Sequence, residues 1–196
     1  DMEGSRGLGD VYKRQQSDMS GTVVSVTGYV TGLDTYGFYM QDGATAAANE
    51  GIYVYCSSLR QAMLDARSVG EQVTVIALVD EYYSLTELNL RTTSNPSVTS
   101  VSIGNTLTPL ATTTGAIGTS CTASGEAHEG LLVTLSGVTL TSEPNSYGEI
   151  SMDDGSGVTQ LEDSILNTDA HLQSLLGTTL TGAQLTSVTG VVKYAY

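Results

Sequence analysis

The sequence has no tryptophan, one phenylalanine and two cysteines, and basic residues are scarce. No run of apolar residues approaches the length of a membrane span. Only 7 lysines and arginines stand against 21 acidic residues, which gives a net charge of −14. Such a surface repels polyanions at long range, and tight non-specific nucleic-acid binding depends on Lys and Arg contacts to phosphate. The charge therefore counts against that class of binding.

Threonine, serine, glycine and valine dominate instead, and tyrosine is abundant with 11 residues. The hydrophobic content of 40% suits a packed core, and the length fits one or two small domains. An acidic, lysine-poor, threonine-rich composition is typical of a secreted protein in salty surroundings. We therefore expect a soluble extracellular β protein.

The most regular stretch runs from Gly21 to Leu90, where apolar residues alternate at period two between turns rich in Gly, Asp, Asn and Ser. Five strand patterns are expected at about 22–33, 38–41, 52–55, 73–79 and 81–90. One helical pattern lies at 58–67, with Ala62, Met63 and Ala66 on its buried side. Five strands with a helix after the third predict an OB-fold, a small Greek-key barrel.

Residues 5–15 read S-R-G-L-G-D-V-Y-K-R-Q. This string matches, letter for letter, the translation of a transposase adapter used in sequencing libraries. We expect residues 1–16 to be a disordered, non-native leader, with the first domain spanning 17–92. The natural N-terminus is then missing, so the lack of a signal peptide is uninformative.

A second copy of the pattern begins near Gly130, after a Ser/Thr/Pro-rich segment at 93–125. That segment predicts a linker, either extended or carrying one or two short strands around Val98 to Leu107. In the second copy L-L-V-T-L-S-G-V-T-L-T replaces V-V-S-V-T-G-Y-V-T, and the Tyr-Gly turn recurs at 147–148. The chain thus reads as all-β, with two tandem OB-fold-like Greek-key barrels. The second, at 126–196, is expected to lack its last strand, so its C-terminus is cut.

Four motifs carry a family resemblance: V-T-G-Y-V-T-G at 26–32, Y-G-F-Y-M-Q-D-G at 36–43, G-I-Y-V-Y at 51–55 and E-Y-Y-S-L-T-E-L at 81–88. In this order they resemble the OB-fold-like modules found beside the catalytic domain of secreted bacterial endonucleases and exonucleases. The resemblance implies a secreted, non-catalytic accessory region. That region would present DNA or RNA to a catalytic domain of the same polypeptide that this chain lacks.

The candidate nucleic-acid site lies on the outer face of the first barrel. Tyr39, Tyr53 and Tyr55 alternate with the core residues and could stack bases, single-stranded or duplex, with Arg60 and Arg91 nearby. Tyrosines are also common on strands for packing alone. The rival interpretation is a structural or adhesive spacer of a surface protein, which could contact glycans.

No catalytic constellation is visible, because His128 and His171 lack metal-ligand spacing and no phosphate-binding loop occurs. Asp153, Asp154 and Asp163 are weak candidates for Ca²⁺, although D-D-G-S-G is too short for a calcium loop. Cys56 and Cys121 could form one disulfide or remain separate thiols.

Overall fold

The structure is a computed structural model that describes residues 18–83, 85–119, 123–162, 172–174 and 176–193. The expected leader, residues 1–16, and Asp163, His171 and Cys121 lie outside these residues. The described chain is predominantly β and contains a closed five-stranded barrel. Among its helices, none is both long and apolar enough to span a membrane.

The first barrel closes because β1 pairs with β2 on one side and with β4 on the other. Around the ring the order is β1, β2, β3, β5, β4, and every pairing is antiparallel except that of β3 with β5. Its strands are β1 (Val23–Leu33), β2 (Gly37–Gln41), β3 (Gly51–Tyr55), β4 (Gln72–Tyr82) and β5 (Leu85–Asn89). The five expected strands are therefore present, with bounds shifted by a few residues.

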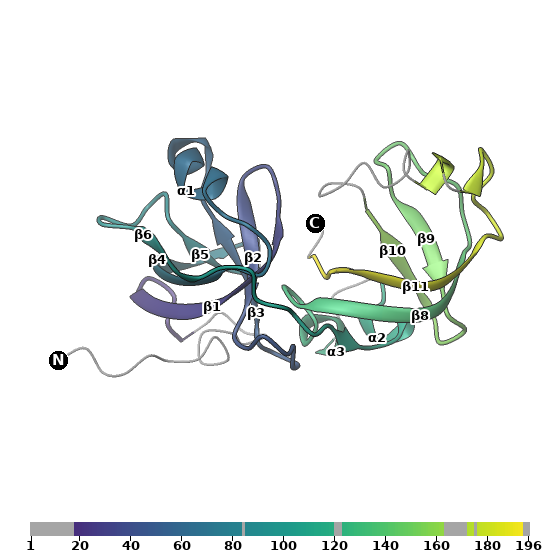
Figure 1. Cartoon of the computed structure of the whole chain (residues 1–196), viewed down its shortest axis with the longest axis horizontal. Coiled ribbons are helices and arrows are strands. Elements are labelled where there is room, and N and C mark those ends of the chain that lie inside the picture. The colour runs from purple at the N-terminus through teal and green to yellow at the C-terminus, as the bar shows by residue number, and fades with distance from the viewer. Residues whose placement is uncertain (1–17, 84, 120–122, 163–171, 175, 194–196) are drawn as a thin grey trace.

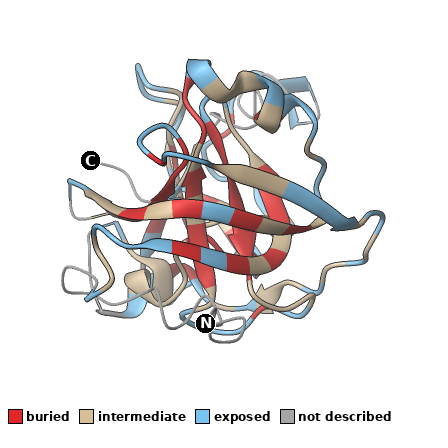
Figure 2. Cartoon of the chain, turned by 90° about the vertical axis from the view of Figure 1, so that its left-hand side faces the viewer, coloured by how far each residue is buried: buried red, intermediate tan, exposed pale blue. Residues whose placement is uncertain are grey.

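The period-two pattern fills the barrel interior, as the alternating burial along the strands shows (Figure 2). Val73, Val75, Ala77 and Val79 of β4 all point inward and are fully buried. Phe38 and Met40 of β2 meet them, together with Ile52 and Val54 of β3 and Leu88 of β5. Apolar burial of this kind is the main force that holds a small barrel together.

The expected helix at 58–67 is a 3-10 turn, η2 (Ser58–Arg60), followed by a single α turn, α1 (Gln61–Asp65). Leu64 is its buried residue, with Met63 partly buried against the core. Ala62 and Ala66 are exposed, so the prediction of the helix's buried side was wrong for both. The 3-10 turn contributes this shift, because its three residues per turn rotate the following residues relative to a continuous α-helix.

The segment at 93–125 is folded rather than extended. Strand β6 (Ser97–Ser102) pairs with the first half of β4 and extends the first sheet, so the first unit reaches beyond residue 92. Strand β7 (Leu110–Ala111) pairs with the second sheet, and two short helices, α2 (Thr114–Ile117) and α3 (Ala123–Glu126), follow it. This segment is thus divided between the two units.

The second unit holds a five-stranded sheet in the order β10, β9, β8, β11, with β7 alongside β8. Its strands are β8 (Leu132–Leu140), β9 (Ile150–Asp153), β10 (Val158–Leu161) and β11 (Gln184–Val191). Leu135, Val138, Leu140 and Ile150 form its buried core with Leu180. Within 163–176 the structure describes only residues 172–174 and 176, and Leu172 among them packs into this core.

The two units meet along the bottom of the first barrel, where β8 begins (Figure 1). The backbone N–H of Asn49 donates to Ala127 O at 2.8 Å, and Thr31 Oγ1 donates to Gly130 O at 3.2 Å. Ala46, in the β2–β3 loop, packs with buried Leu131 of the second unit. A shared core cluster and direct hydrogen bonds therefore join the units.

Candidate nucleic-acid interface

Strand register arranges the outward side chains of the first barrel in rows. Tyr39 of β2 is paired with Tyr53 of β3, Tyr53 with Glu87 of β5, and Glu87 with Asp80 of β4. We call this set the central row. Because side chains two residues apart share a face, Tyr55 and Asn89 form the next row toward the β1–β2 loop. The tyrosines expected on one outer face do share it.

Tyr39 nevertheless does not offer a surface for stacking. Only 4% of the surface of Tyr39 is exposed to solvent, and its ring centroid lies 4.9 Å from that of Tyr53. The interpretation of Tyr39 as a base-stacking residue is therefore corrected: it is a packing residue. Tyr53 and Tyr55 are half-buried and keep part of their surface exposed.

The side chain of Tyr53 leans toward the β1–β2 loop. Its hydroxyl donates to Asp34 Oδ1 at 2.9 Å, and the backbone N–H groups of Tyr36 and Gly37 donate to the same oxygen, each at 2.8 Å. A Cβ at position 37 would lie 2.5 Å from the Tyr53 hydroxyl oxygen, so glycine is needed there for this approach. Burial and the nearby Asp34 carboxylate raise the pKa of Tyr53, so the ring stays neutral.

Two carboxylates continue the central row. Asn89 Nδ2 donates to Asp80 Oδ2 at 3.0 Å and to Glu87 Oε1 at 3.2 Å. Burial, and then the charge of Asp80, raise the pKa of Glu87 to about 7, while the hydrogen bond from Asn89 partly offsets them. The floor of the face is therefore acidic and hydrogen-bonded, and it repels phosphate groups placed directly above it.

Three tyrosines at the ends of the strands are far more exposed than those of the central row. Tyr36 in the β1–β2 loop is 56% exposed, and Tyr82 and Tyr83 at the β4–β5 turn are 53% and 72% exposed. The rings of Tyr82 and Tyr83 meet edge to face, with centroids 4.8 Å apart, and Tyr83 has a positive φ of 48°. Sequence reasoning missed all three, although aromatic residues inside turn segments were a visible signal.

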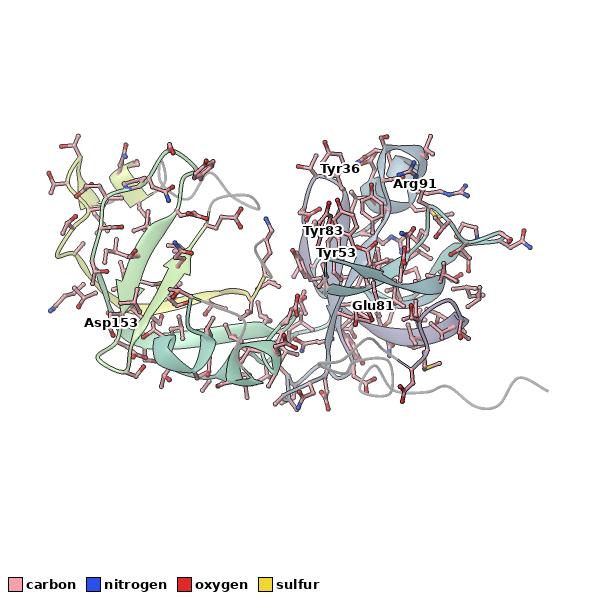
Figure 3. The ribbon with its side chains drawn as sticks, turned by 180° about the vertical axis from the view of Figure 1, so that it is seen from behind. Tyr36, Tyr53, Glu81, Tyr83, Arg91 and Asp153 are labelled. Carbon is pink, nitrogen blue, oxygen red and sulfur yellow. The ribbon has the colours of Figure 1, made fainter. Side chains whose placement is uncertain are left out.

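We call the surface formed by Tyr36, Tyr53, Tyr55, Tyr82 and Tyr83 the tyrosine face. Figure 3 shows Tyr36, Tyr53 and Tyr83 on the side of the first barrel that is nearer the second unit. Stacking on aromatic rings needs such exposed π faces and tolerates any base. The arrangement can therefore hold a flat, unpaired ligand by stacking rather than by charge.

The two arginines predicted to lie near the nucleic-acid site, Arg60 and Arg91, differ in their positions and exposure. Arg91 follows β5 and is exposed, and its backbone N–H donates to Asn89 Oδ1 at 2.9 Å. Arg60 is half-buried at the start of α1, with its Nε enclosed and without a hydrogen-bond partner. Arg91 therefore lies at one end of the tyrosine face, beyond Asn89, whereas Arg60 belongs to the 3-10 turn.

The acidic residues of the second unit are tied into a loop. Asp154 accepts hydrogen bonds from Thr114 Oγ1 and Ser156 Oγ, and these bonds lower its pKa to about 2. Asp153 Oδ1 accepts from the backbone N–H groups of Gly155 and Gly157. Within the described residues no group of three His, Cys, Asp or Glu side chains has the geometry of a metal site. Asp154 therefore ties the β9–β10 loop to Thr114 of α2, whereas Asp153 bonds within that loop.

The remaining candidates have structural surroundings. Cys56 is a fully buried free thiol, and burial raises its pKa to about 12. His128 uses both ring nitrogens: Nε2 lies 2.9 Å from Thr112 Oγ1 and Nδ1 lies 2.7 Å from Ser124 O. This histidine links the segment before α2 to the turn after α3.

No protein-family model matches the sequence, and no curated protein matches it significantly.

Proposed function

We propose that the chain is a non-catalytic, nucleic-acid-binding accessory region of a secreted nuclease, made of two OB-fold-like units. In this role it presents single-stranded DNA or RNA to a catalytic domain in the same polypeptide. The observation that carries the proposal is the tyrosine face, which gathers aromatic side chains from β3, the β1–β2 loop and the β4–β5 turn. In OB-folds the strand 2–3 face and these two loops bind oligonucleotides and oligosaccharides.

The strand order supports the assignment to OB-fold-like units. The ring β1, β2, β3, β5, β4 contains five strands with a helix between the third and fourth, as in that fold. In the second unit the pairings β8–β9, β9–β10 and β8–β11 repeat those of β1–β2, β2–β3 and β1–β4. Internal repetition of the pairings supports two like units.

The carboxylates of the first barrel support a second candidate function, that of an adhesive or spacer module that contacts glycans. Asp34, Asp80 and Glu87 line the tyrosine face, and carboxylates accept hydrogen bonds from sugar hydroxyls while repelling phosphate. Tyrosine rings pack against apolar faces of sugars as well as against bases. The two candidates therefore differ in whether a phosphate backbone is tolerated.

The experiment that tests the proposal is a fluorescence-anisotropy titration of a labelled single-stranded oligonucleotide at low salt. Tyr36→Ala and Tyr83→Ala should each weaken binding, since each stacked base contributes about 1–3 kcal/mol. Tyr147→Ala is the matched control, because Tyr147 is 79% exposed but lies in the β8–β9 loop of the second unit. Binding by a neutral oligosaccharide in place of the oligonucleotide would favour the glycan candidate.

A second measurement tests the non-catalytic part of the proposal. The purified protein is incubated with plasmid DNA and Mg²⁺ or Ca²⁺. We expect no cleavage. Metal-dependent cleavage that survives repurification would contradict the accessory role.

A further inference from the structure

The second unit covers part of the surface on which the first barrel would bind its ligand. Gln41 and Gly51 form the row next to Tyr39 and Tyr53, on the same face of β2 and β3. Leu132 N–H donates to Gln41 Oε1 at 3.2 Å, and a Cβ added to Gly51 would lie 2.6 Å from Gly130 C. The segment 129–132 therefore rests on this row and forms a wall beside the tyrosines.

The end of β11 lies next to the same wall. Gly130 N–H donates to Val192 O at 2.8 Å, and Val192 N–H donates to Leu131 O at 3.1 Å. Strand β11 also contacts β1 of the first barrel. Figure 1 shows the C-terminal end of β11 in the space between the units. The residue after Val192 is Lys193, so the chain carries a cation to the edge of the tyrosine face.

Lys193 is held in this region by an ion pair. Its Nζ lies 3.0 Å from Glu162 Oε1 and 3.2 Å from Oε2, and both side chains are about one-third exposed, at 33% and 35%. An exposed pair of this kind contributes little to stability. The ammonium can therefore exchange the carboxylate for another anion without loss of the fold.

We infer that Lys193 is a phosphate-contacting residue of a composite site, in which the second unit supplies a positive charge at the end of the face far from Arg91. This inference rests on the proposed function. Arg91 lies at the opposite end of the face, beyond Asn89, and the chain advances about 20 Å from Leu85 to Arg91 at about 3.3 Å per residue. The tyrosines lie between the two cations, so a short single strand can stack on them while its backbone reaches a positive charge at each end.

The acidic floor gives this arrangement a physical reason. Asp80 and Glu87 disfavour phosphate over the middle of the face. When the positive charges lie at the two ends of the tyrosine face, the phosphates bind there and the bases lie over the middle. The neutral edges and π faces of the bases tolerate nearby carboxylates and tyrosines. Glu162 competes with the ligand for Lys193, which should keep the affinity weak.

The test is a titration of the full chain with a labelled single-stranded oligonucleotide at several salt concentrations. Lys193→Gln should weaken binding roughly fivefold to tenfold at about 20 mM salt and reduce the slope of log K against log salt by about 0.7. Lys193→Arg should retain the affinity and the slope. Glu162→Gln should strengthen binding, because it removes the competing carboxylate.

Tyr36→Ala separates the two proposals. It should weaken binding but leave the salt slope unchanged, because the substitution removes stacking and no charge. If Tyr36→Ala loses affinity while Lys193→Gln keeps both its affinity and its slope, the composite site is refuted and the proposed function stands. If the unsubstituted protein binds no oligonucleotide, both proposals are refuted.

Discussion

Gln41 connects the two units directly: its Oε1 accepts a hydrogen bond from the backbone N–H of Leu132 at 3.2 Å. Its Nε2 donates to Gly43 O at 2.9 Å, and the side chain is fully buried. A buried amide that satisfies one partner in each unit fixes how the units meet. The wall beside the tyrosine face depends on this contact.

Replacing Gln41 with leucine should therefore destabilise the protein. The substitution leaves the N–H of Leu132 and the carbonyl of Gly43 without this partner, at a cost of about 1–3 kcal/mol. Chemical denaturation measures the loss. Gln61→Leu is the control, since Gln61 bonds only at the surface, to Asp65 at 2.9 Å, and its replacement should change stability by less than about 0.5 kcal/mol. Equal effects of the two substitutions would contradict the role of Gln41.

Gly51→Ala should loosen the same junction by a steric route. A Cβ there would overlap Glu129 O and Gly130 C, both backbone atoms that cannot swing aside. Overpacking of this kind costs about 1–3 kcal/mol. Gly190→Ala in β11 is the matched control, because nothing lies within 4 Å of its added Cβ. A melting temperature lowered by Gly51→Ala but not by Gly190→Ala is the expected result, and equal melting temperatures would contradict it.

The strands of the first barrel could be predicted because their inward residues repeat every second position, as in Val73, Val75, Ala77 and Val79. The burial of Tyr39 could not be predicted, because it depends on tertiary packing: the ring of Tyr53 lies against Tyr39, and residues 129–132, far away in the sequence, contact the neighbouring row of Gln41 and Gly51. A short strand at residues 97–102 was predicted only as one of two alternatives, because its Ser/Thr-rich pattern suits a linker as well as an edge strand; the structure confirms the strand.

Glu87 should make stability depend on pH. Its pKa is about 7 in the folded protein and near 4.5 when unfolded. Between these values the folded state holds a proton that the unfolded state has lost, so stability falls as pH rises from about 4.5 to 7 and then levels. The loss is about 2 kcal/mol, allowing for solvent screening at the barrel surface.

Glu87→Gln keeps the hydrogen bond from Asn89 and removes the charge. The variant should be more stable than the unsubstituted protein at pH 8, with a flatter profile between pH 4.5 and 7. Urea denaturation across this range measures both quantities. If the free energy of unfolding changes with pH equally steeply in both proteins, a group other than Glu87 causes the pH dependence.

Cys56 should be unreactive in the folded protein. Its thiol is fully buried and its pKa is raised to about 12, so neither access nor the thiolate is available at pH 8. In a Cys121→Ser variant, which leaves only Cys56, a thiol reagent should label the protein in denaturant and not under native conditions. Rapid labelling under native conditions would show that the barrel opens around Cys56 and would contradict this prediction.

The most direct test of the tyrosine face is an NMR titration of the ¹⁵N-labelled protein with a short single-stranded oligonucleotide. We expect the amide resonances that shift to belong to residues 34–39, 53–55 and 80–91, together with Lys193. Shifts confined to the β8–β9 and β9–β10 loops, or no shifts at millimolar oligonucleotide, would contradict it.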